Sequence, residues 1–321
     1  MLNMKLSIIV PCYNSELYIE RCIKSLVSIN STEVEFVFIN DGSTDKTEDI
    51  IQTYMNHDSR ILIYSKPNGG YSTAINYGIE HSTGEYIMFV GSDDELCSEN
   101  MNLLLNELDS KVDIIYFTTK IIYDDGVTEI DKETNYTNVG MYLNDLYELT
   151  RIIGSDQKII FNRDTSRIFR KNTIGKTRYF GNIGVSADGC FSSLVASKAR
   201  SFKFINLIGY IWHLRNNSVS SAPKTIFKLE DELIVWGSFF KSVQVEFKDK
   251  PIPLTISRFI WFYWRTYYRI TQLNNNYSKE PINDIKRIRR WLLRKKKTQI
   301  KEKIYLLLPK IYFSHFLKTR T

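Results

Sequence analysis

Five short apolar segments alternate with amphipathic helical segments along residues 1–118, and this alternation constrains the fold more than any other feature. The expected strands are Leu6–Val10, Val34–Ile39, Ile61–Tyr64, Tyr86–Val90 and Ile114–Thr118. The helices expected between them run from an N-cap at Ser15 to about Val27, from an N-cap at Ser43 or Thr44 to about Met55, from Tyr71 to about His81 and from Ser98 to about Leu108. Because the connections are short, this order predicts a doubly wound α/β sheet of mostly parallel strands.

Polar side chains follow three of the expected strands. Pro11–Asn14 is expected as a loop after the first strand, Asp41 follows the second, and Asp93 and Asp94 follow the fourth. The carboxyl ends of parallel strands share one edge of a sheet, and ligands bind at that edge. We therefore expect these polar groups to converge.

The adjacent carboxylates Asp93 and Asp94 need a neutralising partner, since like charges at this spacing repel each other. Mg²⁺ and Mn²⁺ favour carboxylate oxygens, so a divalent ion that bridges to a substrate phosphate explains the pair. The alternative is a solvated turn in which Asp94 and Glu95 face the N-terminus of a helix. Asn68–Gly70 adds a glycine loop whose backbone could approach a phosphate. The sequence contains neither a P-loop nor a Gly-x-Gly-x-x-Gly fingerprint after a strand.

Four segments, in this order, resemble the donor-binding half of family-2 inverting glycosyltransferases with the GT-A fold. They are Ser7–Asn14, Ile39–Asp45, Asn68–Gly78 and Ser82–Asp94. The resemblance implies a Rossmann-like, mostly parallel sheet flanked by helices. It also implies a nucleoside-diphosphate sugar as donor, usually a UDP-sugar, and Mn²⁺ or Mg²⁺ as cofactor.

The resemblance assigns residues to the donor site. Pro11 and Asn14 would line the nucleotide pocket, and Asp41 would contact the base, usually uracil. Asp93 and Asp94 would act as the Asp-x-Asp-type element that touches the ribose and the metal-bound diphosphate. From the residues alone, Asn14 can also be a helix-entry turn, and Asp41 an Asx-turn residue.

The third resembling segment places Asn68 and Asn76 on the donor side as well. Two positions depart from the common pattern. Gly91 stands where many members have Asp, and Ile75 stands where many have Arg. The sequence therefore leaves open which of the two remaining carboxylates binds the metal.

Val185–Phe191 resembles the segment of the family that supplies the catalytic base, with Ala187 in the place of the usual Glu. The resemblance makes Asp188 the base. Inversion needs one carboxylate that removes the acceptor hydroxyl proton as the oxygen attacks the anomeric carbon. The alternative is that Asp188 is the N-cap of the following helix.

Two further segments resemble parts of the family that lie near the substrates. In Ile208–Ser218, Arg215 would pair with the diphosphate, for which its planar fork is suited, and His213 would approach the metal. A structural histidine is the alternative for His213. Ser166–Lys171 would lie near the acceptor, or else form a solvated basic strand edge.

The charge is divided unevenly along the chain. Residues 1–240 hold 23 basic and 31 acidic residues, a formal charge of −8, whereas residues 241–321 hold 20 and 5, a charge of +15. Basic stretches with Trp, Phe and Leu resemble interfacial membrane helices, so this tail is expected to bind an anionic membrane surface. A solvated basic helix, nucleic-acid binding and a homo-oligomer interface are the alternatives, and no nucleic-acid motif accompanies the charge.

These patterns predict two regions. Residues 1–225 would form a GT-A domain, with a nucleotide-sugar half at 1–118 and an acceptor half at 119–225, and residues 226–321 a basic, aromatic-rich helical region. No run of 18 uncharged apolar residues occurs, and the N-terminus leads directly into a strand. The expected location is therefore the cytoplasm, with peripheral association at the inner face of the cell membrane.

The predicted activity is metal-dependent, inverting transfer of a hexosyl or N-acetylhexosaminyl group to a saccharide acceptor, lipid-linked in our expectation, in polysaccharide biosynthesis. A sugar-1-phosphate nucleotidyltransferase is an alternative that also uses an α/β sheet and a metal. An inactive, membrane-associated nucleotide-sugar-binding protein is another.

Overall fold

A computed structural model describes residues 4–131, 164–182, 186–215, 225–249, 254–274 and 277–294. The chain divides into two compact units, Met1–Pro223 and Lys224–Thr321. This division lies beside the boundary expected at 225/226. Within the first unit, strand β6 (Ile114–Tyr123) runs through the boundary expected at 118/119, so the two expected halves share one sheet.

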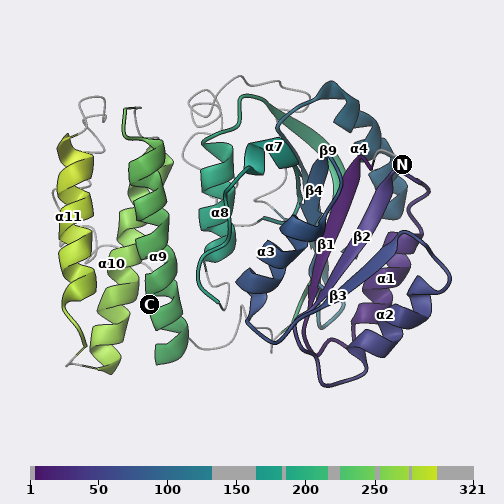
Figure 1. The fold of residues 1–321 in the computed structure, drawn as a ribbon, viewed down its shortest axis with the longest axis horizontal. Coiled ribbons are helices and arrows are strands. Elements are labelled where there is room, and N and C mark those ends of the chain that lie inside the picture. The colour runs from purple at the N-terminus through teal and green to yellow at the C-terminus, as the bar shows by residue number, and fades with distance from the viewer. Residues whose placement is uncertain are drawn as a thin grey trace. The chain divides into compact units, whose positions relative to one another are not determined.

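The first unit is built on a mixed sheet (Figure 1). One side of this sheet holds four parallel strands in the order β3 (Ile61–Ser65), β2 (Val34–Asn40), β1 (Leu6–Cys12) and β4 (Tyr86–Phe89). Every residue of β1, β2 and β4 is buried, which explains why these strands are mostly apolar and do not alternate. Two of the buried polar exceptions, Ser7 and Glu35, are hydrogen-bonded to each other.

The other side of the sheet continues through β8 (Arg167–Arg170), β6, β9 (Phe202–Leu214) and the two-residue β5 (Glu95–Leu96), with β7 (Thr128–Ile130) paired to β6. β8 is antiparallel to both β4 and β6, so β6 and β9 run in the same direction as β1–β4. The mostly parallel α/β sheet predicted from the sequence is confirmed. The alternative of a solvated basic strand edge at Ser166–Lys171 is wrong, because β8 lies inside the sheet and Arg167 is buried.

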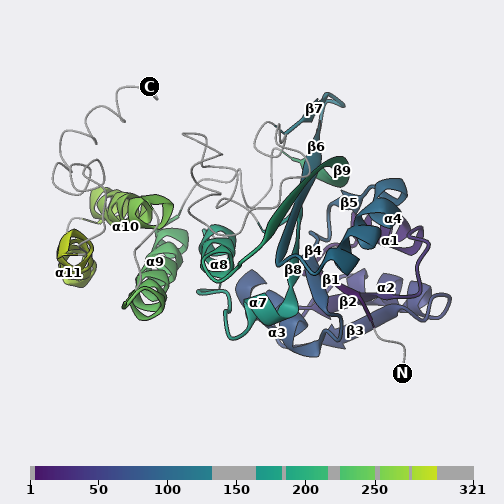
Figure 2. The ribbon, with the colours of Figure 1, turned by 90° about the horizontal axis from the view of Figure 1, so that it is seen from above.

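Helices cover both faces of the sheet (Figure 2). α1 (Ile19–Val27), α2 (Thr47–Met55) and α4 (Ser98–Asn106, continued by a 3-10 turn at Glu107–Ser110) share one apolar core with alternate residues of β1 and β2. α3 (Tyr71–His81) lies on the opposite face, where Gly78 allows close approach. A Cβ at Gly78 would stand 2.4 Å from Ile9 Cγ2. α8 (Ala187–Ala196) shares that face with α3, and a short helix, α7 (Lys171–Ile174), follows β8.

The starts of the first two helices differ from the prediction. α1 begins at Ile19 with no side-chain cap, and the Ser15 hydroxyl instead lies 2.8 Å from that of Ser92. α2 begins at Thr47, whose N–H donates to Asp45 Oδ1 at 3.0 Å. The expected caps are therefore wrong, because these side chains are used in contacts between loops and not at the helix ends.

The predicted loop at Pro11–Asn14 is also shorter than expected, since β1 continues through Cys12. Pro11 pairs with Ile39 of β2. On its other side β4 has already ended at Phe89, and the Val90 N–H donates to Ile9 O as the last bond of that ladder. Proline is tolerated here because no further strand needs its missing N–H.

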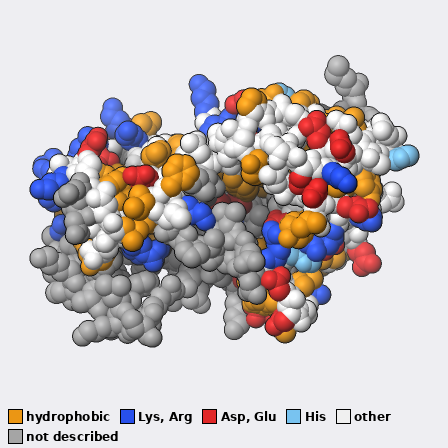
Figure 3. Space-filling model, turned by 90° about the horizontal axis from the view of Figure 1, so that it is seen from below, with side chains coloured by type: hydrophobic (Ala, Val, Ile, Leu, Met, Phe, Trp, Pro, Cys, Tyr) orange, Lys and Arg blue, Asp and Glu red, His pale blue; other side chains and the backbone are white. Residues whose placement is uncertain are grey.

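The second unit consists, in its described part, of α9 (Ile226–Glu246), α10 (Leu254–Leu273) and α11 (Glu280–Arg294). Its buried side chains include Leu229, Leu233, Trp236, Phe239, Phe240, Val243, Tyr263, Ile270, Ile285, Ile288 and Leu292. Lys and Arg side chains gather on the surface of this unit (Figure 3). No helix within the described ranges has the length and apolarity of a membrane span. Residues 295–321, which carry the end of the predicted membrane-binding tail, lie outside the described residues.

Candidate functional site

Asp94 lies past the end of β4, at the edge where β1 and β2 also end. It is 6% exposed, and both its oxygens accept hydrogen bonds from β9. The Tyr210 hydroxyl donates to Oδ2 at 2.5 Å, and the His213 backbone N–H donates to Oδ1 at 2.9 Å. Burial, followed by the charge of Asp93, raises the pKa of Asp94 to about 8. The alternative of a solvated acidic turn is therefore wrong for Asp94.

Asp93 is held by two arginines from distant parts of the chain. Arg215, just after β9, forms an ion pair with Asp93 Oδ2, and Arg21 of α1 donates to the backbone oxygen of Asp93 at 2.6 Å. The Arg215 guanidinium also lies 4.0 Å from the centre of the Tyr18 ring. The predicted partner of Arg215 is a substrate diphosphate. In the structure the Arg215 guanidinium is instead paired with Asp93, an acidic residue of the site.

Gly91 is the point on which the two carboxylates converge. A Cβ at this position would stand 2.8 Å from Asp94 Oδ2 and 2.9 Å from Asp93 Oδ1. Two carboxylate oxygens thus face one small space that glycine leaves open. Hard divalent ions bind such oxygens and complete their shells with water and substrate phosphate. Asp93 and Asp94 therefore fit a divalent cation.

His213 is not brought into this cation site. Its Nε2 lies 2.6 Å from Glu95 Oε1, and no cluster of three or more His, Cys, Asp or Glu side chains suited to a metal occurs among the described residues. The predicted ligand set of Asp93, Asp94 and His213 is not assembled. A short strand pairing explains this, since Glu95 of β5 lies opposite Ile211 of β9 and the histidine turns to that carboxylate.

Asn14 and Asp41 lie at the tips of neighbouring strands, as predicted. Asn14 has a φ of 48°, and its Oδ1 accepts the Thr44 N–H at 2.8 Å, so it joins the loops that follow β1 and β2. Pro11, by contrast, is buried within β1 and shapes the strand end. The alternative of an Asx turn at Asp41 is wrong, because its carboxylate accepts the N–H groups of Gly69 and Gly70. The neighbouring Asn40 bonds this turn instead, since its Oδ1 accepts the Ser43 N–H at 2.9 Å.

The carboxylate of Asp41 organises the glycine loop. It is 3% exposed and accepts the N–H groups of Gly69 at 3.0 Å and Gly70 at 2.8 Å, with Lys66 Nζ at 2.5 Å. Asn68 closes the same loop, since its Nδ2 donates to Asp41 O at 3.0 Å. The expected phosphate cradle at Asn68–Gly70 is therefore wrong, because these amides already serve a buried carboxylate.

Asn76 has a structural role in place of the predicted donor contact. Its Nδ2 donates to Tyr179 O at 3.1 Å, and its Oδ1 accepts the Tyr179 N–H at 2.8 Å. The Asn76 side-chain amide thus bonds both the N–H and the C=O of Tyr179, as a neighbouring strand would. This contact ties α3 to the segment that leads toward α8.

Asp188 lies in the first turn of α8, where Ser186 is the N-cap residue, so the N-cap alternative for Asp188 is wrong. Its Oδ1 accepts the Gly189 N–H at 2.7 Å. The pKa of Tyr71 is raised first by burial and then by the charges of nearby carboxylates, among them both Asp188 and Asp94. The predicted base and the predicted metal ligand are therefore both close enough to Tyr71 for their charges to act on its hydroxyl.

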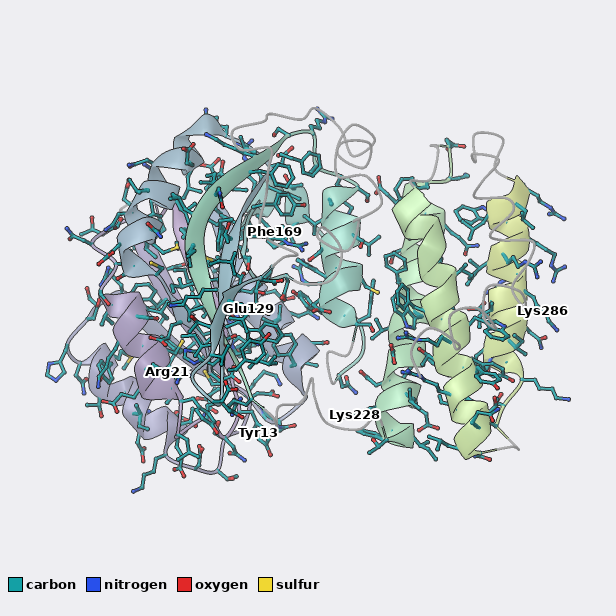
Figure 4. The ribbon with its side chains drawn as sticks, turned by 180° about the vertical axis from the view of Figure 1, so that it is seen from behind. Tyr13, Arg21, Glu129, Phe169, Lys228 and Lys286 are labelled. Atoms are coloured by element: carbon teal, nitrogen blue, oxygen red, sulfur yellow. The ribbon has the colours of Figure 1, made fainter. Side chains whose placement is uncertain are left out.

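Sequence reasoning did not identify several residues of this site. Tyr13, 52% exposed beside Asn14, and Arg21 lie in the lower part of the sheet unit in Figure 4. Tyr13 stands in the same short segment as Pro11 and Asn14, and its aromatic side chain at that position was a usable signal. Tyr210 and Lys66 gave no such signal, because their partners are distant in sequence.

Residues 7–177 match the family model described as Glycosyl transferase family 2. The chain belongs to this family. Among curated relatives, this family-2 chain is 28% identical over 231 residues to the minor teichoic acid biosynthesis protein GgaB of Bacillus subtilis. That alignment covers 70% of this chain and 24% of GgaB. It is 40% identical over 110 residues to the uncharacterized glycosyltransferase EpsJ of B. subtilis, 34% of this chain and 32% of EpsJ. The chain thus spans about a quarter to a third of the length of these relatives.

Solved structures agree with the family assignment at the level of the fold. S. aureus TarS 1–349, solved in complex with UDP-GlcNAc, aligns with a TM-score of 0.65 at 20% identity, over 90% of this chain and 81% of that one. The mannosyltransferase PcManGT from Pyrobaculum calidifontis, solved with GDP-Man and Mn²⁺, aligns with a TM-score of 0.50 at 13% identity, over 96% and 86%. The predicted GT-A fold is confirmed. Family membership also sets aside the nucleotidyltransferase alternative.

Proposed function

We propose that this chain is an inverting glycosyltransferase that moves a sugar from a UDP-sugar to a saccharide acceptor in bacterial polysaccharide assembly. The observation that carries the proposal is the convergence of Asp93 Oδ1 and Asp94 Oδ2 over Gly91, at the edge where β1, β2 and β4 end. Similarity to GgaB, named for teichoic acid biosynthesis, and to TarS, solved with UDP-GlcNAc, supports this donor and this setting.

On the donor side, Asp93 and Asp94 would hold Mn²⁺ or Mg²⁺. The cation would neutralise the diphosphate as it leaves. Arg215 would exchange Asp93 for the diphosphate, since its guanidinium can donate two parallel bonds to phosphate oxygens. The exposed Tyr13 ring beside Asn14 offers a flat face for stacking on the base.

On the acceptor side, Asp188 would remove the proton from the acceptor hydroxyl. The new bond forms between that oxygen and the anomeric carbon, while the bond from the anomeric carbon to the diphosphate oxygen breaks. The proton passes to the Asp188 carboxylate, and attack opposite the leaving group inverts the configuration. General-base catalysis of this kind contributes on the order of 10²–10⁴-fold to the rate.

The helical unit supports a proposal about location. Lys286, Arg287, Arg290 and Arg294 are exposed on α11, and Lys286 points outward from it in Figure 4. A basic surface of this kind is attracted to anionic headgroups by about 1 kcal/mol per Lys or Arg. We infer peripheral association with the inner face of the cell membrane, where a lipid-linked saccharide would be the acceptor. A homo-oligomer interface is the competing role for this unit.

The proposed function is tested by incubating the full chain with a panel of nucleotide sugars and Mn²⁺, and reading nucleoside diphosphate release by mass spectrometry. We expect UDP from one or a few UDP-sugars, and at least a hundredfold less from Asp188→Asn. UDP binding by calorimetry should be the same in both proteins. Binding of UDP with no turnover of any donor would favour the inactive nucleotide-sugar-binding protein instead.

A further inference from the structure

A buried carboxylate, Asp164, has no place in the mechanism described so far. Asp164 is 3% exposed, and its Oδ2 accepts the hydroxyl of Tyr179 and, at 3.4 Å, that of Tyr71. Burial raises the pKa of the Asp164 carboxyl. Burying such a group costs free energy unless hydrogen bonds compensate it, and a purely apolar contact would stabilise the core equally well. The hydrogen bond between Tyr179 and Asp164 therefore calls for a role other than stability.

Tyr179 is the point where three elements meet. Its backbone is held by Asn76 of α3, at 2.8 and 3.1 Å, and its hydroxyl by Asp164. Its ring stacks on Phe191 of α8, with ring centres 4.4 Å apart and planes inclined by 22°. The same ring meets Phe89, the last residue of β4, edge to face at 5.8 Å.

These contacts connect the two halves of the proposed reaction centre. Phe191 follows Asp188 by three positions in α8, so both lie on neighbouring parts of one helical face. Phe89 precedes the segment that carries Asp93 and Asp94. Phe169 of β8, labelled in Figure 4, completes the aromatic group, with its ring centre 5.8 Å from that of Phe191 and 6.0 Å from that of Phe89.

We propose that Asp164 and Tyr179 are positioning residues that fix the first turn of α8, and with it Asp188, relative to the end of β4. Aromatic packing alone permits the rings to slide, whereas the hydroxyl–carboxylate bond fixes the far end of the Tyr179 side chain and so the direction in which it points. The inference rests on the proposed role of Asp188. A base displaced by about 1 Å can lose about a hundredfold in rate, so precise placement has a large effect.

The test compares three variants of the full chain. Tyr179→Phe keeps the ring and removes the bond, and Asp164→Leu removes the acceptor. Both should lower kcat about tenfold or more, with donor KM and UDP affinity within about twofold of wild type. Asp164→Asn keeps an acceptor oxygen and should retain most of the wild-type kcat. Equal kcat in all three proteins and wild type would overturn the proposal.

Tyr86→Phe is the matched control. Tyr86, in β4, is buried like Tyr179, but its hydroxyl donates to Leu108 O at 3.1 Å and its side chain faces the α1 and α4 core. This variant should lower Tm without changing kcat. A parallel fall of kcat in the control would mean that both tyrosines act through general stability.

Hydrogen exchange separates this inference from the proposed function. The amides of residues 187–196 should exchange faster in Tyr179→Phe than in Tyr86→Phe, whether or not a donor is turned over. Unchanged protection of α8 would refute the positioning role even in an active enzyme. Faster exchange in a protein without transferase activity would uphold the structural link and overturn only the function assigned to Asp188.

Discussion

The hydroxyl of Tyr210 lies 2.5 Å from Oδ2 of Asp94, although 116 positions separate the two residues in the sequence. The same hydroxyl accepts the N–H of Gly91 at 3.1 Å. One phenol from β9 therefore holds both the glycine and one carboxylate of the proposed cation site. The site is assembled by the pairing of β5 with β9, which sets Leu96 opposite Tyr210, and not by the Asp93-Asp94 dipeptide alone.

Tyr210→Phe is expected to weaken the site and the fold together. The Gly91 N–H loses its acceptor and Asp94 loses a donor, so the free energy of unfolding should fall by about 1–3 kcal/mol. Binding of UDP in the presence of Mn²⁺ should weaken as Asp94 moves. Thermal unfolding and calorimetry measure the two effects, and unchanged values of both would show that this hydroxyl supports neither.

The double variant Asp93→Ala/Asp94→Ala addresses the cation directly. UDP with Mn²⁺ should raise the Tm of the wild-type protein, because a ligand that binds only the native state stabilises it. The double variant should lose this shift, and EDTA should remove it from wild type. Asp113→Ala, which removes a carboxylate just before β6, serves as control and should keep the shift. A shift that survives in the double variant would place the nucleotide elsewhere.

Gly91→Ala tests the space between the two carboxylates. The new methyl group would stand 2.8 Å from Asp94 Oδ2 and 2.9 Å from Asp93 Oδ1. Asp94 is fixed by Tyr210 and His213, so the clash should fall on the cation site. We expect Mn²⁺-dependent UDP binding to weaken about tenfold or more, a loss of about 1.4 kcal/mol or more. Equal affinity in the variant would show that the cation binds away from this space.

The Asp58–Arg60 pair predicts a pH dependence of stability far from the site. Arg60 lies 2.6 Å from Asp58 Oδ2, and this bond lowers the pKa of the Asp58 carboxyl. A lowered pKa means that the stabilisation is present above the unfolded value of about 3.9 and is lost as the pH falls through the folded value. Asp58→Asn should therefore cost about 2 kcal/mol at pH 7 and clearly less near pH 3. Denaturant unfolding at several pH values measures this, and a cost independent of pH would exclude the ion pair as its source.

The membrane proposal predicts an effect of the α11 charges. Replacing Arg287, Arg290 and Arg294 by Gln should reduce sedimentation with vesicles that contain anionic phosphatidylglycerol, and salt should weaken wild-type binding in the same way. A control variant that replaces two lysines exposed on the first unit, Lys24 and Lys46, by Gln should have no effect. Binding that persists in the α11 variant would point to another surface. Concentration-dependent association without vesicles would favour an oligomer interface.

Much of the first unit was predictable because its signals are local. Tyr71–His81 was predicted with the bounds that the structure gives α3, since its apolar spacing and the preceding glycines lie within one segment. The antiparallel insertion of β8 between β4 and β6 was not predictable. Its residues Arg167–Arg170 are half basic, and the burial of Arg167 depends on tertiary contacts such as its cation–π contact with Tyr116, at 5.2 Å.

The roles of individual polar residues show the same division. Asp41 was placed correctly at a strand end, but its bonds to Gly69 and Gly70 depend on a loop that returns from β3. Asn76 was read as part of a donor motif, and its true partner, Tyr179, is 103 positions away. A motif fixes which residue types stand at which strand ends, and it says little about which donors fill their hydrogen bonds.

The amino-acid sequence by itself determined the order of strands and helices, the position of the acidic pair after β4 and the family, because these depend on periodicity and short spacing. Tertiary structure alone decided that Asp94 is buried under Tyr210, that Arg215 pairs with Asp93, and that the glycine loop serves Asp41 instead of a phosphate. The physical reason is that burial and pairing set the free energy of a charged group. At the acidic pair both depend on residues more than a hundred positions away, since Tyr210 bonds Asp94 and Arg215 bonds Asp93.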